Sequence, residues 1–200
     1  MKITGISILK WKEDTAEPVF LASATELSSF GFFQRGTAAQ FVKFISRTLI
    51  KRTPAGKRQT VEHEGNNVHT YLRSDGLGCA VVADAEYPER VAFTIMSKLI
   101  EQFHSQYAQQ WPTVMEDATL SFEPLDQAII EYQDPSKADK ISKIQKDLDA
   151  TMEVMHKTID SVLERQVKLD KLVETSEDLS MQSKAFYTTA KSHNQCCTIC

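Results

Sequence analysis

One stretch dominates the second half of this 200-residue chain. Residues 141–193 read ISKIQKDLDATMEVMHKTIDSVLERQVKLDKLVETSEDLSMQSKAFYTTAKSH. Side chains of one seam recur there at alternating spacings of three and four residues, the period of a helix that packs along that seam against other helices. Neither Pro nor Gly interrupts the pattern, so we predict a long coiled-coil helix of roughly 80 Å at about 1.5 Å per residue. The seam positions are Ile141, Ile144, Leu148, Thr151, Met155, Thr158, Val162, Arg165, Leu169, Leu172, Ser176, Leu179, Ser183, Phe186, Ala190 and His193.

Arg165 stands in the middle of this seam, and the positions on both sides of it keep the register. A guanidinium has five N–H donors and no acceptor, so burying it is costly unless other chains supply acceptors. A single amphipathic helix also buries nothing by itself and should be poorly ordered alone. We therefore predict that partner helices complete the seam around Arg165, and a four-helix set would close it.

The first half has mixed strand and helix signals, separated from the long helix near Tyr132-Gln133-Asp134-Pro135. Its order reads ββαβββαα, and about 130 residues suffice for one packed core. We predict an α+β domain whose antiparallel five-stranded sheet carries helices on both faces. The expected strands are residues 3–9, 19–23, 58–63, 67–73 and 78–83, and the expected helical faces lie within residues 41–49, 92–107 and 125–132.

Composition excludes several classes of function. A net charge of −4 and a pI near 5.8 do not favour nucleic acid as a partner. No apolar run approaches the roughly 18 residues that span a bilayer, and the N-terminus lacks the apolar core of a secretory signal, so we expect a cytosolic protein. No Gly-rich phosphate loop, catalytic triad or zinc-ligand spacing is present, so we expect no enzymatic activity, no metal and no cofactor.

Three of the four cysteines lie in the tail Cys196-Cys197-Thr198-Ile199-Cys200. A Cys-x-x-x ending is the pattern of a prenylation site, which places a prenyl group on Cys197. One lipid chain gives only marginal membrane binding, and only Lys184 and Lys191 lie nearby to help, so a second lipid is needed. Cys196 is the available thiol: we predict reversible S-acylation by a palmitoyl group there, with a second prenyl group as the alternative. Because Cys200 is unusual at the last position, the prenyl group is open between farnesyl, which we favour, and geranylgeranyl.

Several motifs together resemble one family. They are Gly31-Phe32-Phe33, Asp84-Ala85-Glu86-Tyr87-Pro88, Tyr132-Gln133-Asp134-Pro135, Val162-Leu163-Glu164-Arg165 and the cysteine tail. With them the chain resembles the prenylated longin-domain R-SNAREs, which lack a transmembrane anchor. The resemblance implies a profilin-like longin domain at residues 1–132, an R-SNARE coiled-coil motif at 136–193 and a lipidated tail at 194–200.

The resemblance also implies a function. Arg165 would form a central polar layer with Gln side chains of three Q-SNARE helices, between core layers formed by the apolar seam residues. The complex would drive membrane fusion in ER–Golgi, intra-Golgi and endosomal or vacuolar transport. The protein would sit by its lipids on the cytosolic face of Golgi, endosomal or vacuolar membranes, in exchange with a soluble pool. In that pool the longin domain would inhibit the chain by binding its SNARE motif, and would hold the prenyl group in an apolar groove near Phe41 and Phe44.

Two alternatives stay open at this point. The chain could be a prenylated trafficking adaptor that tethers membranes through its long helix without driving fusion. It could also be an enzyme acting on lipids or thioesters with Cys79 as nucleophile, although Cys79 lies in an apolar run and is more simply a small buried hydrophobe.

Overall fold

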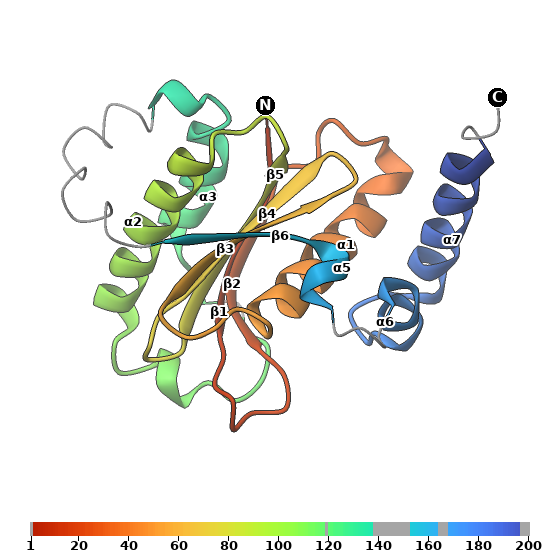
Figure 1. The fold of residues 1–200 in the computed structure, drawn as a ribbon. Coiled ribbons are helices and arrows are strands. Elements are labelled where there is room, and N and C mark those ends of the chain that lie inside the picture. The colour runs from red at the N-terminus through yellow and green to blue at the C-terminus, as the bar shows by residue number, and fades with distance from the viewer. Residues whose placement is uncertain (1, 119, 138–152, 164–167, 197–200) are drawn as a thin grey trace.

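The computed structural model describes residues 2–118, 120–137, 153–163 and 168–196 (Figure 1). The strands are β1 (Ile3–Lys10), β2 (Val19–Thr25), β3 (Lys57–His63), β4 (Asn66–Leu72), β5 (Leu77–Asp84) and β6 (Val154–Thr158). The α-helices are α1 (Arg35–Ile50), α2 (Glu89–Tyr107), α3 (Glu123–Glu131), α5 (Ile159–Val162), α6 (Leu169–Thr175) and α7 (Met181–Cys196). Two short 3-10 turns lie at Phe32–Gln34 and Trp111–Thr113.

All six strands form one sheet in the order β2-β1-β5-β4-β3-β6. The first five pair antiparallel, which confirms the predicted sheet and its order of elements. The sixth strand was not predicted. It comes from within the heptad region and lies parallel to β3, from Arg58 opposite Val154 to Glu62 opposite Thr158.

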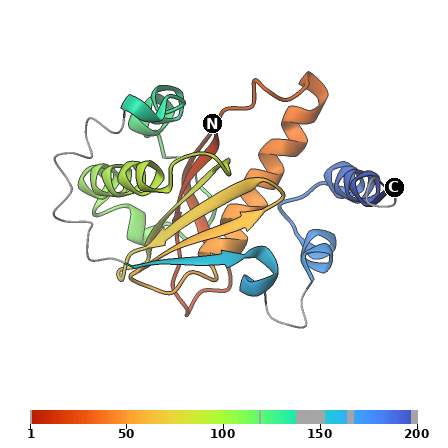
Figure 2. The same ribbon diagram turned by 45° about the horizontal axis from the view of Figure 1, so that its top comes forward.

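Helices cover both faces of the sheet, as predicted. Helices α2 and α3 pack on one face and α1 on the other (Figures 1 and 2). The larger core cluster lies under α2 and α3, with Ile6, Cys79, Met96 and Phe103 at its centre, all fully buried. On the other face α1 approaches β1 so closely that a Cβ atom at Gly5 would collide with Val42.

The turns follow from local chemistry. Gly65 joins β3 to β4 at φ 75°, and Gly76 joins β4 to β5 at φ 97°, a conformation that favours glycine. Pro88 directly precedes α2, whose first turn carries Glu89, and an acidic residue there is stabilised by the positive end of the helix dipole. These features hold the meander and α2 where the sequence predicts them.

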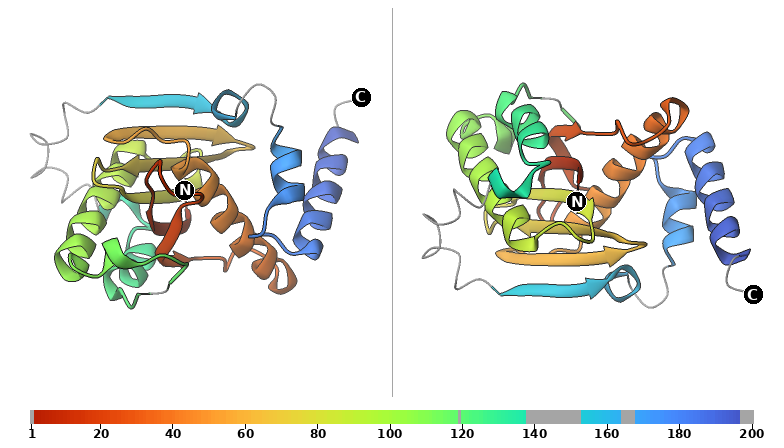
Figure 3. Two further views of the ribbon diagram at one scale, coloured as in Figure 1. Left: turned by 90° about the horizontal axis from the view of Figure 1, so that it is seen from below. Right: turned by 90° about the horizontal axis from the view of Figure 1, so that it is seen from above.

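The heptad region departs from the prediction of one continuous helix. Within its described residues the chain forms β6, α5, α6 and α7, and α6 and α7 lie outside α1 (Figure 3). The physical reason is that a lone helix buries none of its seam, whereas the folded-back segment finds an apolar surface on the first half of the chain. The segment instead buries apolar side chains against α1 and the β3 edge, where unpaired backbone groups accept β6.

Candidate functional site

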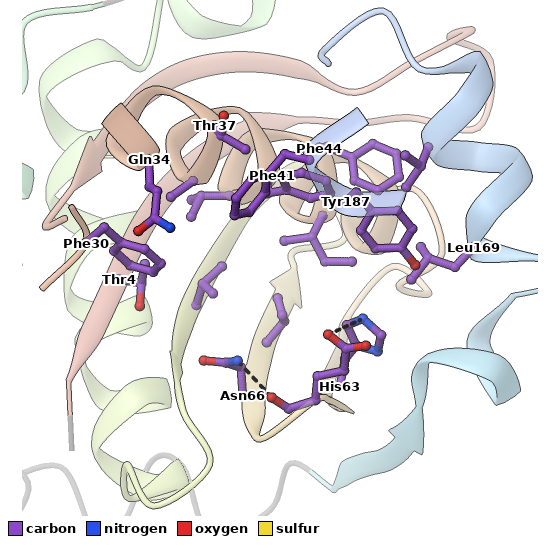
Figure 4. A pocket seen from close by; sticks show the side chains of 18 residues that line it. Thr4, Phe30, Gln34, Thr37, Phe41, Phe44, His63, Asn66, Leu169 and Tyr187 are labelled. Atoms are coloured by element: carbon purple, nitrogen blue, oxygen red, sulfur yellow. Dashed lines mark hydrogen bonds and ion pairs between the residues drawn. The ribbon is translucent and has the colours of Figure 1, made fainter. Parts of the chain in front are cut away.

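A cavity of about 350 Å³ lies between α1, the β3–β4 hairpin and helices α6 and α7 (Figure 4). Its floor is apolar. Strand residues Val68 and Val82 line it from the sheet, and Leu169 and Val173 line it from α6. The cavity therefore has walls from both halves of the chain, which are far apart in sequence.

Aromatic side chains of α1 form one wall. Phe41 and Phe44 meet edge to face, with ring centroids 6.3 Å apart and planes at 88°. Phe41 also stacks on Tyr187 of α7, at 5.5 Å and 28°. Both predicted groove residues thus line the cavity, although Phe44 is itself 5% exposed and belongs to the core beneath α1. Such a wall suits a flexible apolar chain better than a polar ligand.

The rim of the cavity is polar. The Tyr187 hydroxyl donates to Asp170 at 3.2 Å, and the Asn66 amide donates to the carbonyl of Glu64 at 3.2 Å. Burial, together with the nearby Asp170 carboxylate, raises the pKa of Tyr187, so its hydroxyl remains a neutral donor. His63 lies beside Glu64 on the hairpin, 3.9 Å away. An apolar floor beneath a polar rim fits a ligand with an apolar body and a polar attachment point.

The seam residues do not share one surface here. Leu169 and Leu179 are buried against α1, and Val162 and Leu172 pack at the margin of the same cluster. Met155 lies in β6 opposite Gln59, and Phe186 lines the cavity while 44% exposed. Cys196 is the last residue of α7. Of the other predicted positions, Ile141, Ile144, Leu148, Thr151, Arg165 and Cys197 lie outside the described residues.

Three docking residues were missed by the heptad analysis. Ile159, Leu163 and Val173 are 6%, 4% and 3% exposed and complete the cluster beneath α1. Each follows a seam residue by one position. The only signal was a second apolar shoulder beside the seam, which the search for a strict seam ignored.

Polar contacts fix β6 on the opposite face. The Thr60 hydroxyl donates to Glu89 at 2.7 Å and lies 3.0 Å from Nδ1 of His69, while His156 of β6 lies 3.5 Å from the same Glu89 oxygen. Burial, and to a lesser degree His156, lowers the pKa of His69 to about 4. His69 is therefore neutral at physiological pH, and the chain of contacts assigns its proton to Nδ1, donating to Thr60. These groups link β3, β4, α2 and β6.

The remaining chemistry-bearing groups do not form a reactive site. Cys79 is fully buried in β5, and burial raises the pKa of its thiol, which disfavours the nucleophilic thiolate. Across residues 2–118, 120–137, 153–163 and 168–196, no group of three or more His, Cys, Asp or Glu could hold a metal ion. In the same part of the chain, no helix has the length and apolar character needed to cross a bilayer.

Comparison with known proteins decides the family. A longin model, described as a regulated-SNARE-like domain, matches residues 27–129, and a synaptobrevin model matches residues 140–198. The chain belongs to the longin-domain R-SNARE family. The first match covers β3 to β5, helices α1 and α2 and most of α3, and the second covers the segment that supplies β6 and helices α5 to α7.

Full-length relatives agree with both matches. The chain is 44% identical to the VAMP-like protein YKT61 of Arabidopsis thaliana, over all of both chains. It is 46% identical to the synaptobrevin homolog YKT6 of Debaryomyces hansenii and 44% identical to the synaptobrevin homolog ykt6 of Schizosaccharomyces pombe, again over all of both chains. The protein is thus an R-SNARE that acts in vesicle trafficking and membrane fusion, and its partners are other SNARE proteins.

Proposed function

We propose that this R-SNARE is lipid-anchored and autoinhibited, and that its longin domain holds the SNARE motif until three Q-SNARE helices displace it. The proposal rests on the contacts of residues 154–163 and 168–189 with α1 and β3. In the described residues these contacts bury Ile159, Leu163, Leu169, Val173 and Leu179 against the longin domain.

The contact between Tyr187 and Asp170 carries the proposal. Their side chains lie 3.2 Å apart, because α6 and α7 are folded against each other. In one continuous helix the same residues would be roughly 25 Å apart along the axis, at about 1.5 Å per residue. The docked arrangement and the assembled helix therefore exclude each other, so docking competes with assembly.

The cavity supports a lipid-binding role for the longin domain. A prenyl group on Cys197 would expose apolar surface to water, and the walls built around Phe41 and Tyr187 would cover it in the docked state. Farnesyl is the favoured group, with geranylgeranyl as the alternative. A palmitoyl group on Cys196, or a second prenyl group there, supplies the further anchor that stable membrane binding requires.

Assembly provides the work of fusion in this account. Arg165 meets Gln side chains from three Q-SNARE helices, whose amide oxygens accept its fixed donors in a dry layer. The core layers around it are Ile141, Ile144, Leu148, Met155, Val162, Leu169, Leu172, Leu179 and Phe186 of the motif at 136–193. Zippering from Ile141 towards Cys197 pulls the lipid anchors of two membranes together. The proposed setting is the cytosolic face of Golgi, endosomal or vacuolar membranes, in exchange with a cytosolic pool that has the prenyl group covered.

The groove is tested with the prenylated full-length chain and Phe44→Glu. Phe44 is 5% exposed, so a charge there disrupts the wall, and we expect a larger hydrodynamic radius and stronger vesicle binding. Phe33→Glu places the same charge on α1's N-terminal approach at a side chain that is 91% exposed, and serves as the control. An unchanged radius and unchanged vesicle binding in Phe44→Glu would reject the groove.

The polar layer and the tail have separate tests. A peptide of residues 137–193 mixed with Gln-bearing SNARE helices should give a heat-stable complex that loses stability or register in Arg165→Ala. A tethering adaptor would give no such complex.

Mass spectrometry of the native C-terminus reports both lipids, and an unmodified Cys197 would rule out anchoring through this tail.

A further inference from the structure

The turn between α6 and α7 is joined to the longin domain by a bidentate ion pair. Arg47, on α1, donates from Nε to Oδ2 of Asp178 at 2.8 Å and from Nη2 to Oδ1 at 3.0 Å. The two side chains are only 18% and 16% exposed. Two parallel charge-assisted bonds in a half-buried site are stronger and more specific than an ordinary surface ion pair.

Other contacts hold the guanidinium in place independently of Asp178. Nη1 donates to the carbonyl of Pro18 at 2.7 Å, Nη2 donates to Asp117 at 2.6 Å, and the group lies 4.8 Å from the centre of the Phe20 ring. Asp117 in turn accepts the backbone N–H of Phe20 at 3.0 Å. All of these partners belong to the longin domain, so the Arg47 guanidinium stays in position when the SNARE motif leaves.

The turn that carries Asp178 is also held in place by hydrogen bonds. Its backbone N–H donates to the Ser176 hydroxyl at 3.1 Å, which fixes the turn that presents the carboxylate. Two residues later the N–H of Ser180 donates to the side chain of Gln40 at 2.8 Å. Asp178 precedes the seam residue Leu179 but is not itself a seam position, so assembly of four helices does not use its side chain.

We propose that Arg47 and Asp178 form an ionic latch that sets how much of the chain is docked. This inference rests on the proposed autoinhibition and names the contact that regulates it. The burial of Ile159, Leu163 and Val173 supplies non-directional affinity, whereas the latch requires a carboxylate at one position of the turn. Opening exposes the Asp178 carboxylate to water, while Arg47 loses two hydrogen bonds and keeps those to Asp117 and to the Pro18 carbonyl.

Hydrogen exchange of the full-length chain tests the latch. Asp178→Asn keeps the shape and removes the charge, and we expect exchange in residues 154–175 to rise by about tenfold. Glu174→Gln is the control, because it removes one negative charge at an exposed position of the same segment. In an Arg47→Lys background, which cannot make both parallel bonds, Asp178→Asn should have a smaller effect.

The salt dependence of hydrogen exchange gives a second test, because a contact without charge would not depend on ionic strength in this way. Exchange of the wild type should increase with salt as the Debye length falls from about 10 Å at 0.1 M to about 3 Å at 1 M, and exchange of Asp178→Asn should increase less. If residues 154–175 are protected equally in the wild type, Asp178→Asn and Glu174→Gln, the latch is rejected while docking stands. If those residues are unprotected in the wild type, the autoinhibition itself fails.

Discussion

The two halves of this chain gain their stability in different ways. Among the residues that the structure describes, the buried cluster under α2 and α3 is built from residues 3–132, with Val154 of the second half packed at its margin. The buried apolar residues described in the second half join the cluster beneath α1, whose other members come from the longin domain. One half has a core of its own and the other shares one. The longin domain should therefore keep its fold while the SNARE segment changes partner.

Polar contacts also join the SNARE segment to helix α1. Helix α1 holds the segment through Arg47, Gln40 and Thr37, which bond to Asp178, Ser180 and Ser183. These bonds concentrate at the turn before α7 and its first residues. Variants that damage only one of the two halves therefore test whether the halves are stabilised separately.

The largest effect is expected from the core that the longin domain owns. Phe103 is fully buried between Tyr107 and Phe122. Phe103→Ala should lower the free energy of unfolding by about 3–5 kcal/mol, because the smaller side chain leaves a cavity in the core. Urea denaturation measures it, with the exposed Phe33→Ala as a control expected to stay within about 0.5 kcal/mol of the wild type. A small change in Phe103→Ala would show that this core is not the stable unit.

A pH effect of similar size is expected from His69. Its folded pKa of about 4 lies below the ordinary histidine value of 6.5, chiefly because the ring is buried. The unfolded chain binds the proton more readily, so stability is complete above pH 6.5 and falls as the pH drops towards 4, by up to about 3 kcal/mol. Urea denaturation between pH 4 and 7.5 should show this slope in the wild type and a flatter one in His69→Gln. Equal slopes would contradict a neutral buried His69.

Val173→Asp should weaken docking of the SNARE segment and spare the longin domain. Val173 is 3% exposed beneath α1 but is not a seam position. Burying a carboxylate there should weaken docking by about 2 kcal/mol, leave longin unfolding unchanged and speed assembly with Q-SNARE helices. The matched variant Leu172→Asp, at the neighbouring seam position, should impair assembly instead. Slower assembly in Val173→Asp would show that docking does not compete with it.

The smallest effect is expected at the cavity rim. Tyr187→Phe keeps the ring stacked on Phe41 and removes the bond to Asp170. We expect docking to weaken by about 1 kcal/mol, measured as faster hydrogen exchange in α6. Asp170→Asn removes the acceptor's charge and should loosen the same contact to a similar or smaller degree. No change in either variant would mean that the rim contributes nothing to docking.

Local patterns were enough to predict the longin domain. Alternating residues around Gly65 and Gly76 predicted the meander, and the apolar face from Phe41 to Leu49 predicted α1. These signals depend on neighbours in sequence, and tertiary packing reinforces them. The predicted groove residues Phe41 and Phe44 also line the cavity.

Other features could not be read from the sequence. Strand β6 lies in a stretch whose heptads predict helix. Its pairing with β3 depends on a sheet edge almost 100 residues away in sequence, which no local pattern reports. The bond between Arg47 and Asp178 spans 131 residues, and nothing near either residue signals the other. A sequence compatible with two folds shows only the one that its local period favours.

The central claim is that the SNARE segment leaves β3 when the four-helix complex forms. Hydrogen exchange of residues 57–63 in the full-length chain tests it most directly, because β6 covers this edge only in the docked state. The account predicts slow exchange in the free chain and a marked increase when three Q-SNARE helices are added, while residues 169–196 become more protected. Exchange of residues 57–63 that stays slow in the assembled complex would contradict it.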